Sequence, residues 1–380
     1  MEIKRLILAL FLLLSASGCS VEISQPPLRT PTPENESSFP SVVPTKSASP
    51  ENTTSSNSPK YQIPVKWSNL GLTGRLVYSR MSSNEDIPAL SVETLDLTTG
   101  EIKKVFTASE DARIYYSAVS PDGKELIISY ILPSDSSPSR NQALYRLPMD
   151  GSTPPQLLVT PPTGSDQYIQ VEWSPDGKYI YYVHNNYSTQ SADQIYPNYK
   201  IFRKAYPDGQ PEQIVEHAFW PRVSPDSSRL VYVSIDPLTG TNELFLSNAD
   251  GTNAQVINTG STTEPGIRDA PFFTSDGLSI IFSAPSPVQS YRPNWLDRLM
   301  GVQIAKAHSL PSDWWIVPIT GGEAARLTQI QATNLFARMS PDNKHIVSFS
   351  LDGLFVMGLD GSNLTSILPD SGGSTVDWIP

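Results

Sequence analysis

A short turn motif, Ser-Pro-Asp, recurs along the chain between segments in which apolar and polar residues alternate. In one copy, Ser174-Pro175-Asp176-Gly177 follows "VEW" and precedes "KYIYYV". Proline, aspartate and glycine in this order favour a type I β-turn, and the flanking alternation predicts two antiparallel strands. Each copy therefore predicts a β-hairpin, and the copies start at Ser120, Ser174, Ser224, Thr274 and Ser340.

A second kind of turn recurs after most copies, at a dipeptide of the Asp-Gly type that lies between short apolar runs, and a weaker sixth member, Thr99-Gly100, precedes the first copy. Such dipeptides are the strongest short-range hairpin signal. They occur at Thr99-Gly100, Asp150-Gly151, Asp208-Gly209, Asp250-Gly251, Gly321-Gly322 and Asp360-Gly361. Each repeat unit is therefore expected to hold four strands, A to D, with the Ser-Pro-Asp turn joining A to B and the second turn joining C to D.

A repeat of roughly 50 residues that is built from four short strands predicts a β-propeller. The C-terminal "STVDWIP" matches "IQVEWSP", which ends a strand A. We therefore expect an all-β, six-bladed propeller over residues 61–380, closed by pairing of its N- and C-terminal strands. The C-terminal strand would supply strand A of the first blade, and residues 74–107 would supply B, C and D. The segment "VKWSN" at 65–69 is the competing candidate for that strand A.

The Trp-Ser-Pro-Asp-Gly-Lys repeat, with an Asp-Gly hairpin after it, resembles the TolB-type β-propeller repeat of bacterial envelope proteins. The resemblance covers about residues 61–380. It implies the fold but no single activity, because the same repeat serves scaffolds, peptidase lids and some lyases. TolB carries an α/β domain ahead of its propeller, for which this chain has no room. We therefore do not expect equivalence to TolB.

The N-terminus has the pattern of an export signal. Lys4 and Arg5 precede a mostly apolar run, Leu6–Ser15, which is too short to span a bilayer. The following "ASGC" resembles the lipobox of bacterial lipoproteins, which implies cleavage after Gly18 and lipidation of Cys19, the one cysteine of the chain. Residues 1–18 are thus expected to be a signal peptide. An ordinary secretory peptide with an incidental cysteine is the alternative.

The segment after the cysteine is rich in residues that do not build a core. Of residues 20–60, 23 are Pro, Ser or Thr, without apolar periodicity, so 19–60 is expected to be a lipid-anchored, disordered tether. The predicted location is the bacterial cell envelope, outside the cytoplasm, with the lipid as the membrane contact. The net charge of −11 argues against nucleic acid as a partner.

Motifs for catalysis or cofactor binding are absent from the sequence. It contains no Walker loop, G-x-G-x-x-G, H-E-x-x-H, G-x-S-x-G or C-x-x-C, so we predict neither a cofactor nor a metal and favour a binding protein over an enzyme. The alternative is a metal held by His184 and His217 near Glu216, since both histidines should lie on one face of neighbouring blades.

Equivalent positions on the innermost strands form a candidate binding site. This position lies two residues before each Ser-Pro-Asp turn and at the matching place in the C-terminal strand. In order around the ring, the residues at this position would be Asp377, Ala118, Glu172, Arg222, Phe272 and Arg338. Glu172 would lie beside Arg222, and Arg338 beside Asp377. These residues either form two structural ion pairs that line a wet channel or provide the polar surface on which a small ligand binds.

The B–C and D–A connections are longer than the turns on the opposite face, which is typical of a binding surface. One insertion, about 285–312, contains a helical pattern that begins at Asn294 and leaves Tyr291 and Trp295 as candidate contact residues. We therefore expect a scaffold that binds an envelope protein or a surface polymer on this face. The alternative is a lyase or hydrolase with a pocket there.

Overall fold

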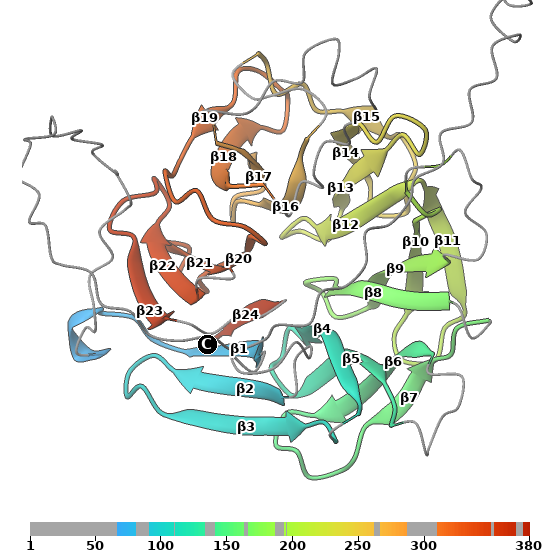
Figure 1. Cartoon of the computed structure of the whole chain (residues 1–380), viewed down its shortest axis with the longest axis vertical. Coiled ribbons are helices and arrows are strands. Elements are labelled where there is room, and N and C mark those ends of the chain that lie inside the picture. Colours follow the sequence, from blue (N-terminus) through green and yellow to red (C-terminus); the bar gives the residue numbers. More distant parts are fainter. Residues whose placement is uncertain are drawn as a thin grey trace, which may run out of the picture. The chain divides into compact units, whose positions relative to one another are not determined.

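The computed structural model describes residues 67–80, 91–109, 111–133, 141–162, 166–186, 194, 196–261, 267–286, 310–350, 353–369 and 375–380. These residues belong to one compact unit, Asn57–Pro380. Their strands are arranged as a ring of sheets (Figure 1). The predicted all-β propeller fold is therefore confirmed.

The strands of the described residues form five sheets. The first contains β24 (Val376–Ile379), β1 (Arg75–Arg80), β2 (Ser91–Asp96) and β3 (Ile102–Thr107). The second contains β4 (Arg113–Val119), β5 (Glu125–Ile131), β6 (Gln142–Pro148), β7 (Gln156–Val159), β8 (Asp166–Trp173), β9 (Tyr179–Asn186), β10 (Lys200–Ala205) and β11 (Pro211–Glu216).

The remaining three sheets have four strands each. One contains β12 (Ala218–Val223), β13 (Arg229–Ile235), β14 (Asn242–Asn248) and β15 (Gln255–Val256). The next contains β16 (Asp269–Phe273), β17 (Ser279–Pro285), β18 (Ser312–Pro318) and β19 (Ala325–Arg326). The last contains β20 (Phe336–Met339), β21 (His345–Ser350), β22 (Gly353–Gly358) and β23 (Thr365–Pro369).

The eight-stranded sheet consists of two four-stranded meanders, β4–β7 and β8–β11. They are joined by one parallel pair, Gln142 with Gln167. The innermost strands β24, β4, β8, β12, β16 and β20 contact one another in this order around the ring. Residues at equivalent positions on these strands therefore face a common centre.

The ring is closed by the two ends of the propeller. β24 pairs antiparallel with β1, with Trp378 opposite Leu76, and Trp378 Nε1 donates a hydrogen bond of 3.0 Å to the Thr73 carbonyl oxygen. This confirms that the C-terminal strand is the strand A that precedes β1–β3. The competing assignment of residues 65–69 is wrong, because Trp67–Asn69 forms a short 3-10 helix.

The Ser-Pro-Asp turns have the predicted hairpin geometry. In the β8–β9 turn, Gly177 N–H donates to the Ser174 carbonyl oxygen at 2.9 Å, and the Ser174 hydroxyl donates to Asp176 Oδ1 at 2.7 Å. Gly177 has a φ of 71°, and Ser227 and Asn343 adopt 60° and 61° at the matching positions. The turn geometry is therefore retained where the sequence has no glycine.

The apolar core lies between adjacent sheets. Trp314 on β18 is fully buried, and its Nε1 donates to Ser348 Oγ on β21 at 3.0 Å, which links two neighbouring sheets. Within the described ranges, no helix combines the length and the apolar character required to cross a membrane. The helix predicted from Asn294 lies outside the residues that the structure describes.

Candidate functional site

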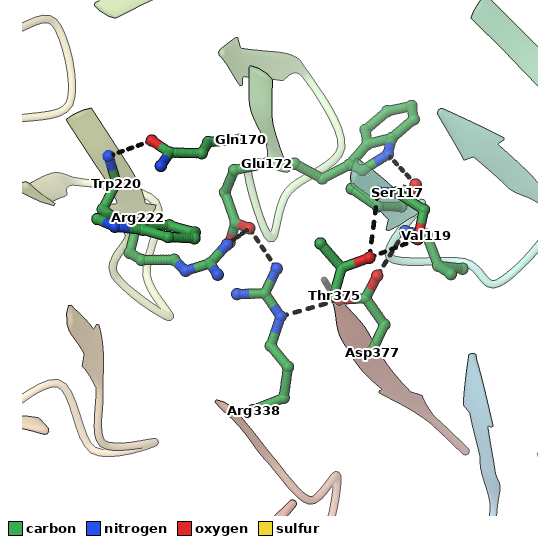
Figure 2. A network of polar contacts seen from close by, with 11 residues as sticks. Ser117, Val119, Gln170, Glu172, Trp220, Arg222, Arg338, Thr375 and Asp377 are labelled. Atoms are coloured by element: carbon green, nitrogen blue, oxygen red, sulfur yellow. Dashed lines mark hydrogen bonds and ion pairs between the residues drawn. The ribbon is translucent and has the colours of Figure 1, made fainter. Parts of the chain in front are cut away.

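The candidate site is built by charged residues at the equivalent position of four innermost strands. Glu172 lies on β8, Arg222 on β12, Arg338 on β20 and Asp377 on β24 (Figure 2). Both predicted ion pairs are present. Arg222 Nη1 lies 2.5 Å from Glu172 Oε2, and Arg338 Nε lies 2.8 Å from Asp377 Oδ1.

A third ion pair, which the sequence analysis missed, joins these two pairs. Arg338 Nη2 lies 2.5 Å from Glu172 Oε2. The strands β20 and β8 are not neighbours in the ring, so this contact crosses the channel (Figure 2). Asp377 Oδ2 also accepts a hydrogen bond of 2.9 Å from the Val119 N–H. The four side chains therefore form one linked group, which we call the channel network.

The channel network is largely shielded from water. The side chains of Arg222, Glu172, Asp377 and Arg338 are 10, 12, 13 and 18% exposed. Burial, followed by the nearby charge of Arg338, lowers the pKa of Arg222 to about 10. Burial also disfavours the charged form of Arg338, but the charges of Glu172 and Asp377 outweigh it and raise its pKa above the ordinary value. Both guanidinium groups are therefore charged at neutral pH.

An aromatic layer lies directly next to the channel network. It is formed by the residues that lie two positions before the ring residues Ala118, Arg222 and Arg338. On β4, β12 and β20 these are Tyr116, Trp220 and Phe336. The Trp220 ring is fully buried and packs at 6.1 Å from Tyr116 and 5.1 Å from Phe336, centroid to centroid. Since neither β4 nor β20 is adjacent to β12 in the ring, the Trp220 ring occupies the centre of the channel.

The two layers lie at different positions along the innermost strands. Each innermost strand runs toward its A–B turn, so the aromatic layer lies farther from these turns than the channel network does. Arg222 also packs over Trp220, with its Cζ 5.9 Å from the ring centroid. At the level of these rings the centre of the channel is lined by aromatic side chains.

The histidines do not assemble the alternative metal site. His184 Nε2 lies 3.0 Å from Asp166 Oδ1, a partner that the sequence analysis did not identify, and its ring packs against Tyr168 and Phe202. Across the described part of the chain, no three His, Cys, Asp or Glu side chains are grouped in a way that could hold a metal. His184, His217 and Glu216 therefore do not form such a group.

Three of the predicted site residues lie outside the described residues. They are the proposed lipid attachment site Cys19 and the candidate contact residues Tyr291 and Trp295. Their roles stay predictions from the sequence.

Comparison with known proteins supports the fold. No family model and no curated protein matches the chain. Among solved structures, TolB from Acinetobacter baumannii is similar at 16% identity and a TM-score of 0.53, over 80% of this chain and 67% of that one. A chain of the nidogen/laminin complex is similar at 12% identity and a TM-score of 0.55, over 80% of this chain and 97% of that one. Identities this low show a shared β-propeller fold and nothing about activity.

Proposed function

We propose that the protein is a six-bladed propeller of the bacterial cell envelope, held to a membrane by a lipid on Cys19, whose propeller is a scaffold for binding a partner. The blade count is supported by the division of the eight-stranded sheet into two meanders joined by a single residue pair. The anchor is supported by the apolar run Leu6–Ser15 and the following "ASGC". Residues 19–60 would then be a flexible tether.

The observation that carries the scaffold function is the channel network. It ties β8, β12, β20 and β24 together across the centre of the ring, and β24 closes the ring by pairing with β1. Its two basic and two acidic groups compensate one another within the protein. Such a core resists relative motion of the blades, and a rigid frame is what a surface of variable loops requires in order to bind a partner.

The partner-binding face in this proposal is that of the B–C and D–A connections. This face bears the longest insertion of the propeller sequence, and Tyr291 and Trp295 are the residues we expect to contact the partner. The partner would be an envelope protein or a surface polymer, because the proposed anchor keeps the propeller at the membrane surface.

The proposal is tested by replacing residues 287–311 with a short Gly-Ser loop. We expect the variant to retain the thermal melt of the wild type and to lose partner capture from a native envelope extract. The matched control replaces residues 134–140, a shorter B–C connection of another repeat unit, and should retain both. Unchanged capture by the folded 287–311 variant would remove this insertion from the binding site.

The alternative function is a lyase or hydrolase that acts on the same face. It requires a general acid or base, or a metal, and His184 beside Asp166 is the nearest arrangement of this kind among the residues that the structure describes. Metal analysis of the purified protein distinguishes the two functions. A stoichiometric transition metal that is lost in His184→Ala would favour the enzyme.

A further inference from the structure

The charges of the channel network are distributed unevenly around the ring. The acidic residues Asp377 and Glu172 flank Ala118, on the side of β24, β4 and β8. The basic residues Arg222 and Arg338 flank Phe272, on the side of β12, β16 and β20. The equivalent position of β16, between the two arginines, is thus apolar and supplies no acid. The basic half of the ring therefore holds no acid of its own, and Glu172 reaches both arginines from the opposite half.

The hydrogen-bonding capacity of the two arginines is only partly used. Arg222 bonds Glu172 through Nη1, and Arg338 bonds Asp377 and Glu172 through Nε and Nη2. Within the described ranges, no hydrogen-bond acceptor contacts Arg222 Nη2 or Arg338 Nη1. By contrast, Glu172 Oε2 accepts from both arginines, and both oxygens of Asp377 are occupied. Donors are in excess on the basic side of the ring.

The surroundings favour binding of an anion at this place. The buried Trp220 ring packs against Tyr116 and Phe336 next to the two guanidinium groups, on the side away from the A–B turns, and so shields them there from water. Electrostatic interactions gain strength where water is excluded. Repulsion from Arg338 contributes to the lowered pKa of Arg222, after burial itself, and the charges of Glu172 and Asp377 offset this lowering only in part. A further anion beside the two groups would offset more of it.

We propose that this end of the channel binds a carboxylate, received by Arg222 Nη2 and Arg338 Nη1 on the face of the A–B turns. Planar guanidinium groups bind carboxylates through paired hydrogen bonds, which a neutral amide cannot match. Glu172 Oε1 is an acceptor without a partner in the described part of the chain, so a hydrogen-bond donor next to the carboxylate would add to recognition. This site rests on the proposed binding role of the propeller, but neither on its lipid anchor nor on its loop-face partner.

The direct test titrates the full-length protein in detergent with benzoate, benzamide and benzamidinium at constant ionic strength. These probes share one shape and carry a negative charge, no charge and a positive charge. We expect benzoate to raise the melting temperature in a saturable way, with at least ten-fold weaker binding of benzamide and none of benzamidinium. Equal shifts with benzoate and benzamide would overturn the proposal.

Two variants locate the site. Arg222→Lys keeps a charge beside Glu172 but removes the planar fork, and should weaken benzoate binding ten-fold or more. The matched control is Arg203→Lys, which lies outside the channel in an ion pair with Glu212, whose side chain is 53% exposed, and it should bind benzoate like the wild type. Phe272→Glu places a carboxylate between the two arginines, and should also abolish binding if this variant folds.

Benzoate binding that is unchanged in Arg222→Lys and in folded Phe272→Glu would contradict the assigned site. If Arg222→Lys fails to fold, the comparison of the three probes on the wild-type protein still decides whether a carboxylate is selected. A failure of the loop-face capture experiment would leave these titrations unaffected, so the two proposals fail independently.

Discussion

Arg338 on β20 and Glu172 on β8 are joined across the centre of the ring by an ion pair of 2.5 Å between Nη2 and Oε2. The same Glu172 oxygen lies 2.5 Å from Arg222 Nη1 on β12. One carboxylate thus compensates two guanidinium groups that are both largely buried. Glu172 is therefore the residue on which the channel network depends.

Replacing that carboxylate should strongly destabilise the fold. Glu172→Gln keeps the size of the side chain but leaves two buried guanidinium groups with Asp377 as their one remaining acidic partner. Removing one member of a buried ion pair typically costs about 3 to 5 kcal/mol. We expect a loss of this size in the free energy of unfolding, measured by urea denaturation.

The control for Glu172→Gln is a similar substitution at the surface. Glu212→Gln removes the partner of Arg203 in an ion pair whose carboxylate is 53% exposed, and such pairs contribute about 0 to 1 kcal/mol. Similar losses in the two variants would show that the channel network has no special weight in stability.

Ring closure predicts a large effect of a small C-terminal deletion. Removing residues 374–380 deletes β24, with the buried Trp378 and the Asp377 carboxylate. Loss of one buried tryptophan side chain typically costs about 3 to 5 kcal/mol, and the open edge of β1 adds to this cost. We expect the thermal unfolding transition to shift far down or to lose cooperativity. Removing Pro380 alone, an exposed residue, should have little effect; equal melting of both truncated proteins would argue against closure by β24.

The turn aspartates predict how stability depends on acid. Hydrogen bonds from the hydroxyls of Ser224 and Ser228 lower the pKa of Asp226 to about 2, below its value of about 4 in an unfolded chain. The carboxylate therefore stabilises the fold above about pH 4 and loses this effect as the pH falls toward 2. The stability difference between wild type and Asp226→Asn should shrink from pH 5 to pH 2 in urea titrations. A difference that is constant over this range would contradict the assignment.

The anchor makes a separate prediction. Cys19→Ser removes the one thiol to which a lipid could be attached, so the variant should remain as an unlipidated precursor or be released as a water-soluble form. Detergent phase partitioning and the intact mass measure both outcomes. A variant that still partitions fully into detergent with the mature mass would show that Cys19 is not the anchor.

Much of the fold could be predicted because the turn motif fixes the register. Ser174-Pro175-Asp176 marks the end of one strand A. Residues that lie the same number of positions before the other turns are therefore at the same level along the axis of the ring. This reasoning yielded the closure by Trp378 and the two ion pairs around Glu172 and Arg338, which the structure contains.

Other features depend on distances that a repeat does not encode. The contact of Arg338 with Glu172 requires the width of the channel, which a turn motif does not specify. The aromatic layer had a usable signal, since Tyr116, Trp220 and Phe336 occupy one repeat position two residues before the ring. The partner of His184 was missed because Asp166 begins β8 in a region without a motif.

The central claim, that the loop face of an envelope-anchored propeller binds a partner, is tested most directly by photo-crosslinking in living cells. A photoreactive residue is placed at Tyr291 or Trp295, and at Lys178 or Lys344, which follow the A–B turns of the opposite face. We predict that positions 291 and 295 both give the same discrete adduct, identified by mass spectrometry, and that positions 178 and 344 do not. Adducts that form only at positions 178 and 344 would contradict the account. The same set of adducts at all four positions would also contradict it.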